Sequence, residues 1–186
     1  MGEPASGAVE GGEPQDQDPA RAAAGGGPLA VGFIAFVVYV SVLAPAPYLL
    51  DSAELAAASF GLGIAHPPGE PLALVLGRLF SLLPLGSVAF RVGLVQAVAG
   101  AIAATLVHRL ARRLIGQVDP TGTLPPVARH LLAATAALGF ALAPGTVISS
   151  NRPEVYALGA ALALGALLAA LRARTHADPR PALLAA

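Results

Sequence analysis

Long apolar runs alternate with short polar stretches along most of the chain, and this pattern predicts a membrane protein made of helices. Residues 29–50 are almost continuously apolar, which is long enough to cross a hydrocarbon layer that needs about 20 helical residues. Three further apolar runs follow, at residues 92–110, 131–148 and 155–171. A bend is expected in the second of these three, at Pro144 and Gly145. We therefore predict an all-α polytopic membrane protein with four transmembrane helices.

A shorter apolar run at residues 72–83 predicts a helix that does not cross the membrane. It is only about a dozen residues long, and Arg78 interrupts it. Pro84 and Gly86 then end it on the side where it began. We expect a short re-entrant or interfacial helix at this position.

The composition agrees with a lipid environment. Hydrophobic residues make up 55% of the chain and charged residues 12%, and the mean hydropathy of +0.70 lies outside the range of soluble globular proteins. The chain has no cysteine, so disulfides and thiolate metal sites are excluded. Residues 1–27 are rich in Gly, Ala, Pro and acids, and we expect them to form a disordered tail. Residues 28–172 then form the membrane domain, and residues 173–186 a cytoplasmic tail or the start of a truncated continuation.

The arginines predict the orientation. They flank the connection between the second and third spans and follow the fourth span, at Arg109, Arg112, Arg113, Arg129, Arg172, Arg174 and Arg180. The positive-inside rule places these segments in the cytoplasm. We therefore expect a multi-pass protein of the inner (plasma) membrane with both termini in the cytoplasm. The stretch at residues 51–71 and the turn at residues 149–154 then face outward.

The polar chemistry is concentrated in the stretch DSAELAAASFGLGIAHPPGEP, which begins at Asp51. It contains Glu54, His66 and Glu70 between apolar segments. Two predicted spans separate this stretch from Arg152 and Glu154, so the chain returns to the same membrane face there. Four acids then share one membrane face, while the predicted spans contain none. The pattern thus lacks the buried carboxylate relay of proton-coupled transporters.

Each of these residues also has a purely structural interpretation. Asp51 and Glu54 form the pattern of a capping box, in which the Asp51 side chain accepts a hydrogen bond from a backbone N–H of the following helix. The HPPG segment at residues 66–69 fits a rigid turn, and Glu154 suits the first turn of a helix. Arg78 and Arg91 have a structural interpretation as side chains that extend their charged ends to the lipid headgroups. Their combined occurrence on one face favours a site.

The order of these segments carries a resemblance. DSAEL, GLGIAHPPGEPL, GRLFSLLPLGSVAFRV, an apolar helix and RPEVYAL resemble the start of a bacterial membrane family of unknown-function designation, related to protein O-mannosyltransferases of the GT-C type. The resemblance covers about residues 29–171 and implies a GT-C-like N-terminal membrane domain. In that superfamily the first outer loop carries an acid and a half-buried helix that begins near a Pro-Pro element. Asp51, Glu54 and HPPG match by position, whereas Ala53 stands where glycine is expected and Glu70 where an aromatic residue is expected.

The resemblance implies a membrane glycosyltransferase that moves a sugar, with mannose as the candidate, from a polyprenyl-phosphate donor to a hydroxyl of a protein or another acceptor. This chemistry needs a carboxylate to accept the hydroxyl proton and cations to steady the departing phosphate. Asp51 is the candidate base, with Glu54 as the second catalytic acid. The candidate donor-binding residues are His66, Arg78, Arg91, Arg152 and Glu154. The implied partners are the lipid bilayer, the lipid donor and a protein acceptor, with no nucleic acid. No cofactor and no dedicated metal site are predicted, although a divalent metal is left open.

Other classes of function stay open at this point. GT-C enzymes have many more spans than four, so we expect the chain to be the N-terminal part of such an enzyme. The alternative is a non-catalytic small membrane protein, either a transporter subunit or an assembly partner. The predicted spans contain few polar side chains, among them Gln96, Thr105, His108 and Thr135. Haem or quinone binding through His108 and His130 is disfavoured, because we expect both residues near the aqueous ends of their helices.

Overall fold

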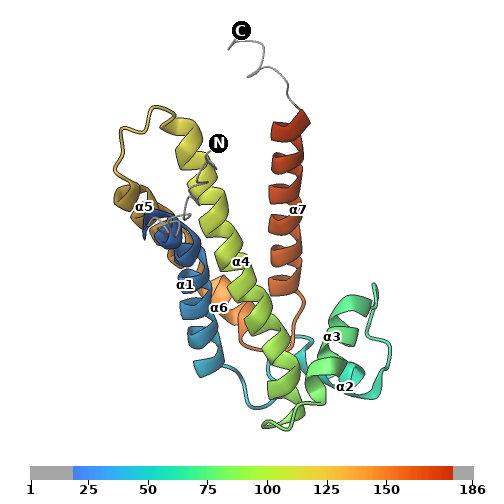
Figure 1. Cartoon of the computed structure of the whole chain (residues 1–186). Helices are drawn as coiled ribbons and strands as arrows, with labels where there is room; N and C mark the ends of the chain where they lie inside the picture. Colours follow the sequence, from blue (N-terminus) through green and yellow to red (C-terminus); the bar gives the residue numbers. More distant parts are fainter. Residues whose placement is uncertain (1–18, 178–186) are drawn as a thin grey trace, which may run out of the picture.

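The computed structural model describes residues 19–177, and all regular structure in that range is helical. The helices are α1 (Pro19–Ser41), α2 (Ser52–Gly61), α3 (Pro71–Ser81), α4 (Val88–Val118), α5 (Pro126–Leu142), α6 (Pro144–Ser150) and α7 (Tyr156–Ala177). The other six helices all pack on α4, which lies at the centre of the molecule (Figure 1). The all-α prediction is confirmed for the described residues.

Small side chains let the long helices approach one another closely. Ala97 and Ala104 of α4 pack in one buried cluster with residues of α1 and α5: Val31, Ala35, Tyr39, Ala137 and Ala141. A second cluster joins α4 to α7 through Ala99, Ala103, Ala157 and Ala161. Alanine and glycine at helix contacts permit the close backbone packing on which helix association in lipid depends.

Gly100 marks the tightest of these approaches on α4. A Cβ atom built there would lie 2.8 Å from Cε2 of Tyr39 and would also collide with the Ser150 hydroxyl. We expect Gly100→Ala to destabilise the fold by about 1–3 kcal/mol, the usual cost of overpacking a close-packed interior. Thermal unfolding in detergent would measure the effect. Gly116→Ala is the matched control on the same helix, because no atom lies within 4 Å of its new methyl group; equal melting temperatures for the two variants would contradict the prediction.

Two helices, α4 and α7, are long and apolar enough to cross a membrane, and the bent pair α5–α6 adds a third candidate. The structure thus has two or three candidate spans among its described residues, rather than the four predicted. The difference lies in residues 29–50, where the helix stops at Ser41. Pro45 and Pro47 follow, and two prolines so close together disfavour a continued helix, because proline lacks an N–H donor and restricts the residue before it. Helix α1 has 23 residues in all, and its stretch Gly26–Ser41 is a shorter apolar helix that is not among the candidate spans.

Other boundaries bear on the sequence predictions as well. The bend expected at Pro144 is present, since α5 and α6 meet there at 63°. Helix α3 has 11 residues, which is too short to cross a membrane, as predicted; its interfacial placement stays a prediction. Helix α1 begins at Pro19, so residues 19–27, which the composition assigned to the tail, are helical. The rest of that tail and residues 178–186 lie outside the described residues.

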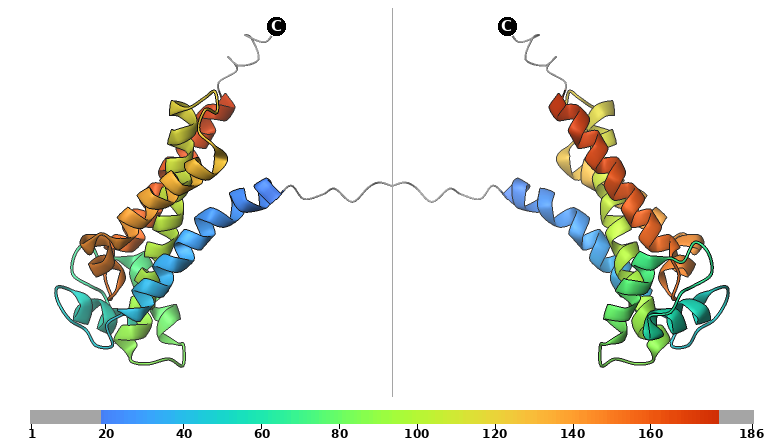
Figure 2. Two further views of the ribbon diagram at one scale, coloured as in Figure 1. Left: turned by 90° about the vertical axis from the view of Figure 1, so that its left-hand side faces the viewer. Right: turned by 90° about the vertical axis from the view of Figure 1, so that its right-hand side faces the viewer.

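The polar connections gather at one end of the bundle. Helices α2 and α3 lie there, beside the start of α4, and the α6–α7 connection meets the α1–α2 connection at the same end (Figures 1 and 2). The backbone N–H of Ala44 donates to the carbonyl oxygen of Asn151 over 2.8 Å and ties these two connections together. The α4–α5 connection and the end of α7 lie at the opposite end (Figure 2). Residues 51–71 and residues 149–154 thus lie at the same end of the bundle, as predicted. The membrane side that each end faces stays a prediction.

Candidate functional site

Asp51 immediately precedes α2, but its side chain does not cap this helix. The backbone carbonyl of Asp51 accepts the first helical hydrogen bond from the Leu55 N–H over 2.8 Å, while its carboxylate makes no capping hydrogen bond. The capping-box interpretation of Asp51 and Glu54 is therefore wrong. The Asp51 carboxylate is about half exposed, at 49%, and one of its oxygens lies 3.8 Å from Nε2 of His66.

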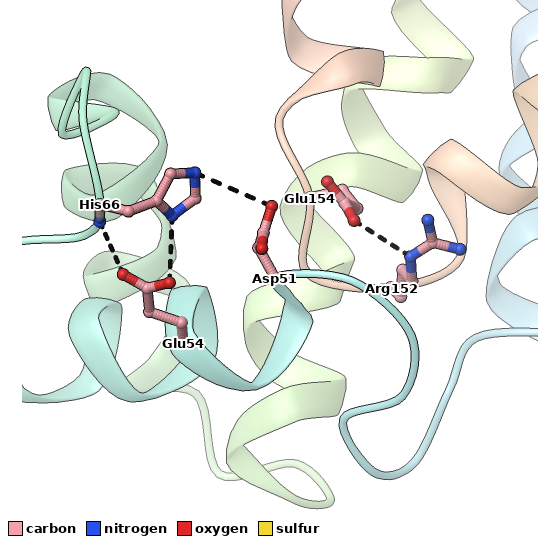
Figure 3. Close-up of polar contacts among 5 residues, drawn as sticks. All are labelled: Asp51, Glu54, His66, Arg152 and Glu154. Carbon is pink, nitrogen blue, oxygen red and sulfur yellow. Dashed lines mark hydrogen bonds and ion pairs between the residues drawn. The ribbon is translucent and has the colours of Figure 1, made fainter.

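Glu54 holds His66 at two points. The backbone N–H of His66 donates to Oε1 of Glu54 over 2.6 Å, and ring atom Nδ1 lies 3.0 Å from Oε2. The turn at residues 66–69 supports this placement, because the Gly69 N–H donates to the His66 carbonyl over 2.8 Å and Gly69 has a φ of +92°, which glycine adopts without strain. Figure 3 shows the imidazole lying between the two carboxylates. The structure thus brings together three of the predicted site residues.

The contacts between Glu54 and His66 shift both protonation equilibria. The hydrogen bond from the backbone N–H of His66, followed by the one from its ring, lowers the pKa of Glu54 below its usual value. The hydrogen bond with Glu54 raises the pKa of His66, and the charges of Glu54, Asp51 and Glu70 act in the same direction. Glu54 must be ionised and His66 protonated for the full attraction. The pair therefore stabilises the loop most between the two pKa values, and this contribution fades above the raised pKa of His66 and below the lowered pKa of Glu54.

We expect Glu54→Gln to lower the pKa of His66 toward its ordinary value of about 6.5. The amide carries no charge, so the ionic part of the interaction is lost. NMR titration of the imidazole carbon-bound protons would measure the pKa. Glu70→Gln serves as the control, because Glu70 acts on His66 only through space and should lower the pKa less. Equal pKa values for His66 in the wild type and in Glu54→Gln would contradict the assigned contact.

Asp51, Glu54 and His66 also offer one ligand atom each within 4.8 Å of one another. Carboxylate oxygens and an imidazole nitrogen are ligands that divalent transition metals accept. All three side chains are exposed, however, and the present contacts already pair both ring nitrogens with carboxylates. The cluster holds together through its own charges and needs no metal for its geometry.

Arg152 and Glu154 form a second charged group, buried in the α6–α7 connection. Nε of Arg152 donates to Oε1 of Glu154 over 3.3 Å, and the two side chains are only 3% and 2% exposed. The guanidinium also lies over the ring of Tyr48, 5.6 Å from its centroid. One nitrogen, Nη1 of Arg152, is buried without a hydrogen-bond partner. Buried donors nearly always have an acceptor. Because this nitrogen has none within the protein, it is available to a ligand.

Contacts from distant parts of the chain hold the α6–α7 connection in place. The Tyr48 hydroxyl donates to Oδ1 of Asn151 over 3.1 Å. Oε1 of Gln96, on α4, accepts from the Leu158 N–H over 3.2 Å and so satisfies a backbone donor in the first turn of α7. The sequence analysis assigned no role to Tyr48 or Asn151 and noted Gln96 only as a polar residue in a span. The available signal was a buried amide in an apolar helix, which requires a partner.

The other two predicted arginines bind backbone carbonyls. Nη1 of Arg78 donates to the Phe60 carbonyl over 2.7 Å, and its guanidinium lies 5.6 Å from the centroid of the Phe60 ring. Arg91 bonds carbonyls at the end of α3 and in the turn that follows, at Ser81 (2.5 Å), Leu83 (3.0 Å) and Ser87 (3.2 Å). Both arginines thus fasten the connections around α2 and α3. Of the predicted cations, Arg152 has the free buried donor.

Comparison with known proteins identifies related sequences. The sequence profile of the Protein O-mannosyl-transferase TMEM260 N-terminal domain matches residues 51–183, which include all seven predicted site residues. The chain belongs to this family. Protein O-mannosyl-transferase TMEM260 of Mus musculus is 42% identical over 104 residues, which cover 50% of this chain and 15% of that relative. No solved structure matches the chain.

Membership of the TMEM260 N-terminal domain family confirms the predicted relation to protein O-mannosyltransferases and to their N-terminal part. The relative named above is a mouse protein, so the bacterial assignment stays a prediction. The chain spans only 15% of that relative's length. The activity in the relative's name is therefore not assigned to this chain by the match. The matched region begins at Asp51, the first residue of the carboxylate–histidine cluster.

Proposed function

We propose that the end of the bundle that carries Asp51 belongs to a membrane glycosyltransferase that moves mannose from a polyprenyl-phosphate donor to a hydroxyl of a protein acceptor. The observation that carries the proposal is the free carboxylate of Asp51, which takes no part in capping α2 and stays half exposed beside His66. A carboxylate in this position can accept the proton of an incoming hydroxyl. The family relation supports the class of reaction.

Asp51, Glu54 and His66 have separate roles in this proposal. Glu54 fixes the His66 ring, and the raised pKa of His66 keeps positive charge next to Asp51. The Asp51 carboxylate stays half exposed and open to an incoming hydroxyl. Asp51 therefore acts on the acceptor hydroxyl, and Glu54 and His66 act as positioning residues.

Arg152 is the proposed ligand of the donor phosphate. Its buried Nη1 needs an acceptor, whereas Nε already donates to Glu154. Hydrogen bonds between guanidinium and phosphate are charge-assisted and stronger than neutral ones, especially away from water. Glu154 keeps the cation in place before the donor arrives, and the phosphate then adds the second partner.

A groove beside Glu154 supports a lipid-linked donor. Its volume is about 420 Å³, and it runs between α3 and the start of α7. Most of its lining is apolar, and Glu70 and Tyr156 add polar groups: Glu70, Leu72, Ala73, Val155, Tyr156, Leu158, Gly159 and Leu162. Because Val155 directly follows Glu154, this groove offers a polyprenyl chain an apolar path away from the charged end of the donor.

Binding of a short-chain polyprenyl-phosphate mannose to the full chain in detergent micelles tests this proposal. We expect saturable binding that Arg152→Lys weakens about tenfold or more, because lysine keeps the charge beside Glu154 but lacks the planar fork of donors. Arg78→Lys is the matched control and should bind normally, since Arg78 bonds only to a carbonyl near the site. Absence of saturable binding would favour the non-catalytic membrane protein instead.

A further inference from the structure

A second cluster of polar side chains lies at the opposite end of the bundle, where α1, α4 and α5 meet. His108 and Arg112 are four residues apart on α4 and share one helix face. The His108 ring centroid lies 6.1 Å from that of His130 on α5. Helix α1 closes over both rings at Gly27, where an added Cβ would lie 3.3 Å from Nδ1 of His130 and 3.5 Å from Nε2 of His108. Glycine is thus the residue that leaves room at this contact.

Two donors in this cluster are buried without hydrogen-bond partners. His108 is only 1% exposed within the bundle, and its Nδ1 makes no hydrogen bond. The expected position of His108 near an aqueous end of its helix stays a prediction. Nη1 of Arg112 is likewise buried and unpaired. The hydrocarbon chains of lipids cannot accept hydrogen bonds, so unpaired donors cost more free energy at a membrane helix than at a water-exposed surface. Nη1 of Arg112 therefore requires an acceptor, and Nδ1 of His108 requires one whenever it carries a hydrogen.

The described part of the chain provides no carboxylate for them. From residue 88 to residue 153 there is one acid, Asp119. Its carboxylate is already bonded to Arg129 over 2.6 Å and to Thr123 and Leu124. The described parts of α1 and α7 contain no acid either. Among the described residues, this end of the bundle therefore carries more positive than negative charge, and a bound anion can balance it.

We propose that His108 and Arg112 bind the phosphate of an anionic phospholipid headgroup in a site between α4 and α5. The phosphate oxygens would accept from Nη1 of Arg112 and from Nδ1 of His108, which carries a hydrogen in the protonated ring and in one neutral tautomer. His130 is only partly buried and lies where the headgroup would enter. Basic pockets between membrane helices are recognised sites for anionic headgroups. The lipid chains would then lie along the apolar, exposed side of α5, which includes Leu131 at 63% exposure.

The test uses the full chain in phosphatidylcholine nanodiscs, titrated with phosphatidylglycerol, with bound lipid counted by native mass spectrometry. We expect saturable uptake of phosphatidylglycerol, weakened about tenfold or more by Arg112→Gln. Arg109→Gln is the matched control, because Arg109 lies on the same helix and loses the same charge but is exposed. It should bind within about twofold of the wild type, since exposed charges interact weakly.

Two results would overturn the proposal. Equal losses in Arg112→Gln and Arg109→Gln would show general attraction to anionic lipid rather than a site. Displacement of phosphatidylglycerol by equimolar inorganic phosphate would show an anion site without a lipid component. His108→Phe, which keeps the ring volume but removes the donor, should match Arg112→Gln. If Arg112→Gln does not give a native circular dichroism spectrum, His108→Phe replaces it as the test variant. Normal lipid uptake by His108→Phe would then refute the site.

Discussion

The proposed function predicts that Asp51→Asn reduces mannose transfer by about 10²-fold or more while helix α2 remains folded. The size follows from the usual contribution of a general base, which the neutral amide cannot replace. Asparagine caps helices about as well as aspartate, and the Asp51 side chain makes no capping bond in any case. The substitution therefore removes proton affinity without removing a structural contact of α2.

Transfer rates in membranes that contain matched amounts of each variant would measure this effect. Glu70→Gln is the control, because Glu70 also precedes a helix without capping it, and the amide keeps the size of a side chain that lines the groove. It should retain transfer within about threefold, the range expected for a charge that acts only through space. Comparable turnover by Asp51→Asn and Glu70→Gln would exclude Asp51 as the base.

Arg152→Met should destabilise the protein by about 3–5 kcal/mol, because it leaves the Glu154 carboxylate buried without its partner. The double variant Arg152→Met/Glu154→Leu removes both charges and should recover most of that stability, since apolar replacement of a buried pair is often neutral. Chemical denaturation in micelles would measure both values. Equal destabilisation of the single and double variants would show that Glu154 does not depend on Arg152.

The same double variant separates structure from function. If Arg152 serves only to neutralise Glu154, the refolded double variant should bind the lipid-phosphate donor normally. If Arg152 holds the phosphate through Nη1, binding should stay lost although stability returns. We expect the second result, because Nη1 is buried and unpaired while Nε already serves Glu154.

The helices that hydrophobic pattern alone defines could be predicted from the sequence. The apolar runs gave α4, α7 and the α5–α6 pair, and Pro144 gave the bend between α5 and α6. The end of α1 was missed, because Pro45 and Pro47 lie within an apolar run that hydropathy alone extends to residue 50. Backbone restriction by the two prolines outweighs that apolar pattern.

The site was predictable in its residues but not in its contacts. A local pattern assigned Asp51 and Glu54 to a capping box, whereas Glu54 bonds His66, 12 residues further along the chain. The burial of Arg152 and Glu154 depends on Tyr48 and Asn151, which lie about 100 residues apart in sequence. Such pairing follows from how α1, α4 and α7 pack, and no spacing in the local sequence encodes it.

The most direct test of the central claim is mannose transfer by a chimera in which residues 51–183 replace the matching segment of mouse TMEM260. Membranes that contain the chimera would receive radiolabelled polyprenyl-phosphate mannose and a protein acceptor, and the label on the acceptor would be counted. The proposal predicts transfer by the chimera and a loss of about 10²-fold or more when the segment carries Asp51→Asn. Transfer that is unaffected by Asp51→Asn, or no transfer by a chimera that is folded and inserted in the membrane, would contradict it.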